Sequence, residues 1–372
     1  MGLALRPARN GRVTAPRPGA AEPAAVPPVA FDHEALAVRT GERSGVPVVV
    51  AVHSTALGPA LGGLRIWHYP DPDDGIRDAL RLASGMTLKA AAAELGLGGG
   101  KGVICAPAGG LEGERRRGAL LDFGDLVESL GGRYITAEDV GTAPADLVAI
   151  SERTGYLTGL PPELGGTGDP SPFTAIGVRG AIRACARERF DAGELAGISV
   201  CVVGLGHVGA ELARLLALDG CELIVADIDP AKRELAARLG ARWVEPGDAA
   251  EVGCEVLAPC ALGGAIDDAN VDLLGCEVVC GSANNQLADD SLAEALDERG
   301  ILYAPDFIAN AGGLIHVYRE IKGYSEERAV ELARGIEATT GRVLEAASLR
   351  ETTPLVAARE LAAERLGAAL RD

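Results

Sequence analysis

The sequence predicts an α/β protein of two domains, the second of which is doubly wound and binds a dinucleotide. Three observations support this prediction. The chain has 372 residues, more than one domain ordinarily contains. Short apolar runs alternate with segments of helical periodicity over most of its length. One apolar run leads directly into a GxGxxG turn, and that turn opens an amphipathic helix.

The first half is predicted to form an open, largely parallel sheet, because strands alternate with helices there. The run VPVVVAV, for example, is apolar throughout, which is typical of a buried strand. The predicted strands span residues 46–52, 103–105 and 133–137, and the predicted helices span residues 76–95 and 118–130.

Three charged residues of this half occupy positions of interest. Lys89 lies in the first predicted helix. Lys101 follows three glycines, which are poor helix formers, so we expect it on a glycine loop. Asp139 comes just after the strand at 133–137 and therefore lies near the carboxyl end of a strand.

Residues 159–172 concentrate glycine and proline, and they predict a linker between the two domains. Ser171 is expected to cap the next helix, with Pro172 in its first turn. The second half repeats the alternation and ends in two helices that are expected to pack back on the first domain. Its predicted strands span residues 198–203, 223–226, 255–258, 277–280 and 301–304, and its terminal helices 326–347 and 354–370.

Composition and charge exclude several classes of protein. Apolar residues make up 48% and charged residues 24%, as in ordinary globular proteins. The net charge of −18 has the wrong sign for a nucleic-acid partner. No apolar stretch is long enough for a membrane span or a secretory signal. The eight cysteines form no CxxC pair and no HExxH motif is present, so we expect a metal-free protein of the reducing cytoplasm.

The GxGxxG motif is expected to bind the pyrophosphate of a dinucleotide. Gly204 would allow a tight turn, Gly206 would let the phosphates approach the backbone, and Gly209 would let the helix pack closely on the strand. His207 is interpreted as a turn residue. The fingerprint consists of Gly204, Leu205, Gly206, His207, Val208 and Gly209.

Asp227 ends the second strand of this unit, 18 residues after Gly209. Its carboxylate would accept hydrogen bonds from the adenine ribose and repel a 2′-phosphate, which favours NAD over NADP. A role as a helix cap or loop acid stays open, partly because Asp229 is close by.

The segment GLGGGKG invites comparison with a phosphate-binding loop, but Leu95 and Gly102 break the GxxxxGK[ST] pattern. We therefore expect Lys101 to be a buried amine whose basicity is lowered by burial and by a second cation, Lys89. An amine near neutrality can move protons. Lys89 can pair with a substrate carboxylate, and Asp139 can bind an ammonium group or exchange its proton.

The chain resembles the leucine, valine and phenylalanine dehydrogenase branch of the Glu/Leu/Phe/Val amino-acid dehydrogenase family. The resemblance implies two Rossmann-like α/β domains flanking a cleft, and NAD-dependent conversion of an L-amino acid to a 2-oxo acid and ammonia by a homo-oligomer. It rests on GPALGGLRIWHY (58–69), DALRLASGMTLKAAAA (78–93), LGLGGGKGVI (95–104), GGRYITAEDVGT (131–142), GDPSPFTAIGV (168–178), GLGHVG (204–209), APCALGG (258–264), GSANNQLA (281–288) and YAPDFIANAGG (303–313).

The resemblance also implies a role for each matching residue. Lys89 would bind the substrate carboxylate, with the backbone of Gly62 and Gly63 close to it. Lys101 would be the proton-transferring catalytic lysine, and Asp139 its acidic partner. The nicotinamide would be held by Thr174 and Asn284, and Ala283 would also belong to the cofactor site. The substrate side chain would meet Leu61, Ala137, Leu314 and Val317. A helix-turn role for Thr174, a turn role for Asn284 and ordinary core packing for the four aliphatic residues stay open.

Three residues depart from the family pattern, namely Leu64, Pro107 and His207, and they bear on fine geometry and specificity. We divide the chain into a disordered extension (1–30), a substrate-binding and catalytic domain (31–160, with residues 326–372 packed back on it) and a NAD-binding domain (161–325).

The expected activity is NAD-dependent oxidative deamination of a branched aliphatic L-amino acid, of the leucine and valine class. No basic residue stands among the four aliphatic positions to neutralise a glutamate side chain. The alternatives are a phenylalanine-type dehydrogenase, a hydroxy-acid oxidoreductase, which would need a His or Arg catalytic pair, and a non-catalytic dinucleotide sensor.

Overall fold

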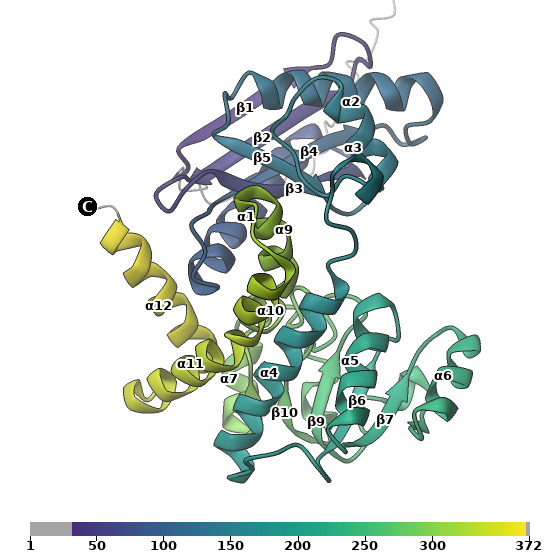
Figure 1. Ribbon diagram of the computed structural model, residues 1–372, viewed down its shortest axis with the longest axis vertical. Helices are drawn as coiled ribbons and strands as arrows, with labels where there is room; N and C mark the ends of the chain where they lie inside the picture. Colours follow the sequence, from purple (N-terminus) through teal and green to yellow (C-terminus); the bar gives the residue numbers. More distant parts are fainter. Residues whose placement is uncertain (1–31, 370–372) are drawn as a thin grey trace, which may run out of the picture. The chain divides into compact units, whose positions relative to one another are not determined.

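The computed structural model describes residues 32–369 (Figure 1). A five-stranded sheet in the N-terminal half and a six-stranded sheet in the C-terminal half are both combined with helices, which confirms the predicted α/β class. The predicted extension, residues 1–30, lies outside the described residues.

The N-terminal sheet is mixed, with the strand order β1-β2-β4-β3-β5. β2 pairs antiparallel with β1 and with β4, whereas β3 runs parallel to β4 and β5. The prediction of a largely parallel sheet is therefore wrong. Only a few residues join β1 to its neighbour β2, too few for the crossover that parallel neighbours need. The strands are β1 Ala35–Thr40, β2 Pro47–Ser54, β3 Ala60–His68, β4 Gly98–Ala106 and β5 Tyr134–Glu138; β1 and β3 lie outside the predicted strands.

The predicted glycine loop is a buried strand. All 9 residues of β4 are buried, and Lys101 is one of them. Glycine is needed for close approach: a Cβ added to Gly100 would lie 2.6 Å from the ring of Tyr134. The placement of Lys101 on a loop is therefore wrong, because β4 lies in the interior of the sheet between β2 and β3.

Helix α1 covers one face of this sheet, and α2 and α3 cover the other (Figure 1). Val49 and Ala51 of β2 pack with α1, while Val48 and Val50 pack with α2, since alternate strand residues point to opposite faces. The helices are α1 Pro72–Ala92, α2 Gly113–Glu128 and α3 Pro144–Ser151.

The C-terminal sheet is parallel throughout, with the order β11-β10-β9-β6-β7-β8. This is a doubly wound order, as predicted, because the chain fills one side of β6 and then the other. The strands are β6 Ser199–Val203, β7 Glu222–Ala226, β8 Arg242–Trp243, β9 Cys254–Pro259, β10 Cys276–Val279 and β11 Leu302–Tyr303. The two-residue β8 lies outside the predicted strands.

The connection between the sheets contacts helix α9. Gly159 and Thr167 both donate hydrogen bonds to the Glu320 carboxylate, at 3.2 Å and 3.0 Å. Ser171 is the first residue of α4, and its backbone N–H donates to the Asp169 carboxylate at 2.9 Å. Ser171 is therefore not the helix cap that was expected, since the capping position lies one residue earlier.

The predicted helix at 326–347 is divided by a turn at Gly335, and α12 contacts both α11 and α1.

All eight cysteines are free thiols. No helix of residues 32–369 is long and apolar enough to cross a membrane. The remaining helices are α4 Ser171–Phe190, α5 His207–Leu218, α6 Arg233–Arg238, α7 Leu292–Glu298, α8 Asp306–Ala309, α9 Gly312–Lys322, α10 Glu326–Arg334, α11 Ile336–Arg350 and α12 Pro354–Ala369, with short 3-10 turns η1 Pro162–Leu164, η2 Pro230–Lys232, η3 Pro246–Asp248 and η4 Val271–Leu273.

Candidate functional site

A cleft of about 560 Å³ brings together most of the predicted substrate residues. One side is formed by β3, β4, α1 and the end of β5, and the other by α8, α9 and the segment after β10. The predicted residues that line it are Leu61, Gly62, Gly63, Lys89, Lys101, Ala137, Asp139, Thr174, Val208, Asn284, Leu314 and Val317.

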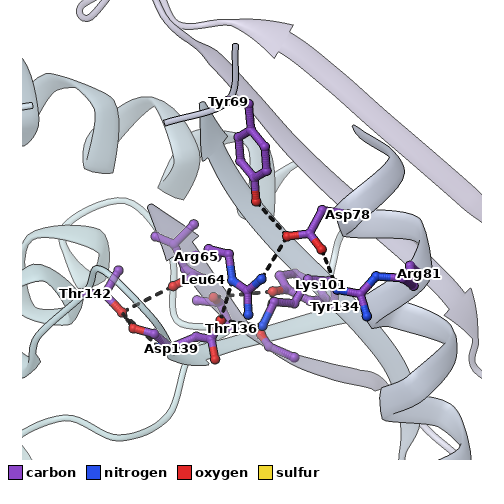
Figure 2. A network of polar contacts seen from close by, with 11 residues as sticks. Leu64, Arg65, Tyr69, Asp78, Arg81, Lys101, Tyr134, Thr136, Asp139 and Thr142 are labelled. Atoms are coloured by element: carbon purple, nitrogen blue, oxygen red, sulfur yellow. Dashed lines mark hydrogen bonds and ion pairs between the residues drawn. The ribbon is translucent and has the colours of Figure 1, made fainter. Parts of the chain in front are cut away.

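Lys101 and Asp139 form an ion pair in this cleft (Figure 2). The Lys101 Nζ atom lies 2.6 Å from Asp139 Oδ2. Lys101 extends from the glycine strand β4, and its side chain is 6% exposed. Asp139 follows β5 directly, and Thr142 fixes the loop there by accepting a 2.9 Å hydrogen bond from the Asp139 backbone N–H. The predicted pairing of these two residues thus has direct geometric support.

Gly62 and Gly63 on β3 leave the space in which this pair fits. A Cβ on Gly62 would lie 1.7 Å from the backbone oxygen of Gly100, and one on Gly63 would lie 2.6 Å from Asp139 Cβ. Any larger residue would therefore push β4 or Asp139 away. The two glycines line the cleft as predicted, but their visible role is to bring the lysine strand and the carboxylate together.

The charges around the pair set its proton affinity. Burial lowers the pKa of the Lys101 amine; the charge of Arg65 lowers it as well, and Asp139 only partly opposes both effects. Burial alone would raise the pKa of Asp139, but the charge and hydrogen bond of Lys101, together with Arg65, hold it below its usual value. The pair is therefore a carboxylate beside an amine that gives up its proton more easily than a free lysine.

Lys89 extends from α1 into the same cleft. Its Nζ atom lies 3.4 Å from Asn284 Oδ1, on the opposite side. Burial, with a smaller effect from the charge of Lys101, lowers the pKa of Lys89 to about 8, and Asp306 opposes that shift. Lys89 is therefore mostly protonated at neutral pH and can attract an anion into the cleft.

Arg65 and Asp78 complete the polar network, and the sequence patterns did not indicate either (Figure 2). Arg65 Nε lies 3.3 Å from Asp139 Oδ2, and Arg65 Nη1 lies 2.8 Å from Asp78 Oδ2. Tyr69 donates to Asp78 at 2.6 Å. The signal that could have found Arg65 is a single charged residue in the apolar alternation of β3.

The GxGxxG segment lies at the start of α5 as predicted. Gly204 has φ +101, which favours glycine, and a Cβ on Gly209 would lie 1.9 Å from the Gly204 backbone oxygen. Gly206 faces open space, since nothing lies within 4 Å of an added Cβ. The turn is thus closed where helix meets strand and open where phosphates would approach a helix N-terminus, which fits a dinucleotide. Of the fingerprint, only Val208 lines the cleft; Leu205 is buried.

Asp227 follows β7 and is turned toward the same turn. Its Oδ2 accepts a 2.5 Å hydrogen bond from the Leu205 backbone N–H, and its Oδ1 accepts one from Asp229 at 2.7 Å. Asp229 caps the short turn η2 by accepting from Ala231. The capping role that was left open for Asp227 therefore belongs to Asp229, whereas the two backbone hydrogen bonds of Asp227 are those of a loop acid, and that alternative stays open.

The two residues expected beside the nicotinamide, Thr174 and Asn284, both line the cleft. Thr174 Oγ1 donates to Pro170 at 3.2 Å in the first turn of α4. Asn284 Oδ1 accepts from Asn310 Nδ2 at 2.8 Å as well as from Lys89. Ala283 is buried behind them and does not line the cleft among the described residues. The buried Oδ1 of Asn310 has no hydrogen-bond partner in the described part of the chain.

The four aliphatic positions all line the cleft. Leu61 and Leu314 are 2% and 6% exposed, and Val317 packs against the same cluster. Met86 of α1 joins them, although the sequence patterns did not indicate it. Leu314 lies in the first turn of helix α9.

Comparison with known proteins covers most of the chain. Residues 32–156 match the family described as Glu/Leu/Phe/Val dehydrogenase, dimerisation domain. Residues 230–372 match the family described as glutamate/leucine/phenylalanine/valine dehydrogenase.

Individual relatives that align over most of the chain are also amino acid dehydrogenases. The chain is 43% identical to a leucine dehydrogenase from Thermoactinomyces intermedius over 90% of this chain and 91% of that protein. It is 40% identical to a valine dehydrogenase from Streptomyces virginiae, over 90% and 94% of the two chains. The crystal structure of L-tryptophan dehydrogenase from Nostoc punctiforme superposes with a TM-score of 0.82 at 37% identity, covering 92% of this chain and 98% of that one. The chain therefore belongs to the Glu/Leu/Phe/Val dehydrogenase family and is an NAD(P)-dependent amino acid dehydrogenase.

Proposed function

We propose that the protein catalyses the reversible, NAD-dependent oxidative deamination of a branched aliphatic L-amino acid to its 2-oxo acid and ammonia. The observation that carries this proposal is the contact of 2.6 Å between Lys101 and Asp139 in a cleft that also holds Lys89. One amine is set to exchange protons and the other to hold a carboxylate.

The cleft residues divide the chemistry among them. Bound at the fingerprint, the cofactor supplies the hydride acceptor for the substrate Cα. Lys89 holds the substrate carboxylate by charge, beside the backbone of Gly62 and Gly63. Neutral Lys101 takes a proton from the water that attacks the substrate's imine carbon. Asp139, ionised in the resting site, accepts protons and gives them up again until ammonia leaves.

The choice of NAD is proposed from Asp227. Its carboxylate accepts hydrogen bonds from two backbone N–H groups, which fixes its position at the end of β7, and its charge would repel a 2′-phosphate. The residues proposed to hold the cofactor are Gly204, Leu205, Gly206, His207, Val208, Gly209, Asp227, Thr174, Ala283 and Asn284. Leu205 and Ala283 are buried, so both would act through backbone and packing.

Aliphatic specificity is proposed from Leu61, Ala137, Leu314 and Val317. None of them carries a charge or a hydrogen-bonding side chain, so a polar substrate side chain would lose its hydration without compensation. The 37%-identical tryptophan dehydrogenase favours an aromatic substrate as the second candidate.

We also propose the domain division given above, in which residues 31–160 with the C-terminal helices bind substrate and residues 161–325 bind NAD. The contact of α12 with α1 supports the return of the C-terminus to the first domain. A homo-oligomer is proposed because residues 32–156 match a dimerisation domain. The eight free thiols support a place in the reducing cytoplasm.

A panel of L-amino acids with NAD and NADP, followed by NADH or NADPH absorbance, tests the proposal. We expect leucine and valine to have the highest kcat/KM. The variant Leu314→Gly should raise the efficiency for phenylalanine relative to leucine by roughly tenfold or more, because each methylene of misfit costs ~1–3 kcal/mol. A wild-type preference for phenylalanine or tryptophan would remove the aliphatic assignment while leaving the dehydrogenase activity in place.

A further inference from the structure

Arg65 joins two carboxylates that would otherwise be separate. Its Nε donates to Asp139 Oδ2 at 3.3 Å and its Nη1 donates to Asp78 Oδ2 at 2.8 Å (Figure 2). The Arg65 side chain is 22% exposed and that of Asp78 is 14% exposed. Buried or partly buried groups of this kind keep their geometry better than surface ion pairs.

Asp78 is itself fixed by two further donors. Tyr69, just after β3, donates to Asp78 Oδ2 at 2.6 Å, and Arg81 of α1 donates to Oδ1 at 2.8 Å. The position of Arg65 is thus set by β3 at its backbone and by α1 at its guanidinium. Because a guanidinium is a rigid planar fork, it can hold two acceptors in fixed directions, which a lysine ammonium cannot.

Lys101 and Arg65 contact the same oxygen atom, Asp139 Oδ2. During the proposed reaction Lys101 alternates between its charged and neutral forms. When it is neutral, Asp139 would lose its main counter-ion if nothing else were present. Arg65 keeps its charge throughout, because Asp139 and Asp78 raise its pKa against the effect of burial.

We propose that Arg65 is a positioning residue for the Lys101–Asp139 pair, bridging Asp139 to Asp78 so that the carboxylate is held in place and returns to its ionised form while the proton on Lys101 comes and goes. The proposal rests on the proposed function of that pair. Arg65 itself is not assigned contact with substrate.

The Arg65 bridge predicts the direction in which the pKa of Lys101 shifts when a neighbouring charge is removed. The charge of Arg65 lowers the pKa of Lys101, whereas the charge of Asp78 raises it. Removing one or the other charge should therefore move the pKa in opposite directions, which a general loss of structure would not do. The charged groups around Lys101 come from every element packed on it: Asp139 after β5, Arg65 on β3, Asp78 and Lys89 on α1, with Asp306 of α8 facing Lys89.

The test is the pH profile of kcat/KM for the best amino acid with NAD, in Arg65→Gln, Arg65→Lys, Asp78→Asn and the control Arg77→Gln. The substrate amino group titrates identically in all of them, so differences report the protein. In Arg65→Gln the rising limb should move to higher pH by about one unit, and kcat should fall by roughly tenfold, with a smaller change in KM. In Asp78→Asn the limb should move to lower pH.

Arg65→Lys should keep the limb at its wild-type position but not recover kcat, because it restores the charge without the bridge. Arg77 lies on α1, as Asp78 does, and among residues 32–369 it pairs only with Asp74, at 2.7 Å, so Arg77→Gln should match wild type. Thermal unfolding and NADH fluorescence titration check that each variant folds; if Arg65→Gln does not, the two other variants carry the test.

An unchanged profile in Arg65→Gln, or shifts of equal sign in Arg65→Gln and Asp78→Asn, would overturn the inference. The variant Lys101→Ala distinguishes a failure of this inference from a failure of the proposed function. If Lys101→Ala is inactive and Arg65→Gln is like wild type, only the inference fails. If Lys101→Ala is active, the proposed function of the pair fails first.

Discussion

Two glycine-rich segments of this chain look alike in sequence and do opposite things in the structure. Gly98–Gly102 lies within strand β4, buried between two other strands. In the second segment, Gly204–Gly206 forms a turn before helix α5, and Gly209 lies in the first turn of that helix. In the first segment an added Cβ on Gly99 would lie 2.1 Å from a backbone nitrogen of α1, whereas in the second an added Cβ on Gly206 meets nothing within 4 Å.

The difference shows that glycine serves two purposes around one cleft. In β4 it removes side chains so that α1 and β3 can pack directly against the strand, which brings Lys89 and Lys101 into the same cleft. In the turn before α5 it leaves the backbone uncovered for a ligand. Four predictions test this contrast, from the largest expected effect to the smallest.

The strongest test asks whether the glycine strand carries chemistry. Lys101→Ala should lower kcat by ~10²- to 10⁴-fold, the usual contribution of a positioned proton-transfer group, while NADH binding stays close to wild type. Steady-state kinetics and fluorescence titration measure the two. Lys322→Ala, an exposed lysine at the end of α9, is the matched control. Near-normal turnover in Lys101→Ala would show that β4 contributes to packing and not to proton transfer.

The second test adds a methyl group to one glycine of each segment. Gly100→Ala should lower the free energy of unfolding by ~1–3 kcal/mol, because its Cβ would press on the ring of Tyr134 at 2.6 Å. Gly206→Ala should change stability little and weaken NADH binding instead. Denaturant unfolding and NADH titration distinguish them, and equal destabilisation of both variants would remove the contrast.

The third test concerns pH and Lys89. Lys89 is charged below its pKa of about 8 and neutral above it, so kcat/KM for the amino acid should fall as pH rises through this value. Activity falls along this limb because neutral Lys89 no longer offers a positive charge to the substrate carboxylate. Lys89→Arg should move that falling limb to higher pH, and Lys89→Ala should raise KM by roughly tenfold or more. A limb that stays in place in Lys89→Arg would assign it to another group.

The smallest effect is expected at the edge of the open turn. Asp227→Ser should raise the ratio of NADP to NAD efficiency by about tenfold, since it removes the repelling charge. Asp229→Ser is the control, because Asp229 is exposed and caps η2 without contacting the fingerprint. If Asp229→Ser changes the ratio and Asp227→Ser does not, the ribose contact belongs to Asp229.

Much of the C-terminal half could be predicted from local patterns. β6, β7, β9 and β10 lie within about two residues of their expected ranges, because buried parallel strands are short apolar runs that a single window reveals. The N-terminal sheet was harder to predict. β3 reads ALGGLRIWH, in which two glycines and an arginine interrupt the apolar pattern, and its partners are defined only by contacts distant in sequence.

The sequence by itself determined the α/β class, the dinucleotide turn and the three charged residues Lys89, Lys101 and Asp139. These depend on residue identity and on spacing within one segment. Only the tertiary structure decided that Lys101 stands on a buried strand, and that Arg65 and Asp78 surround its partner. The physical reason is that strand order and ion-pair geometry arise from contacts between segments tens of residues apart, which no local pattern encodes.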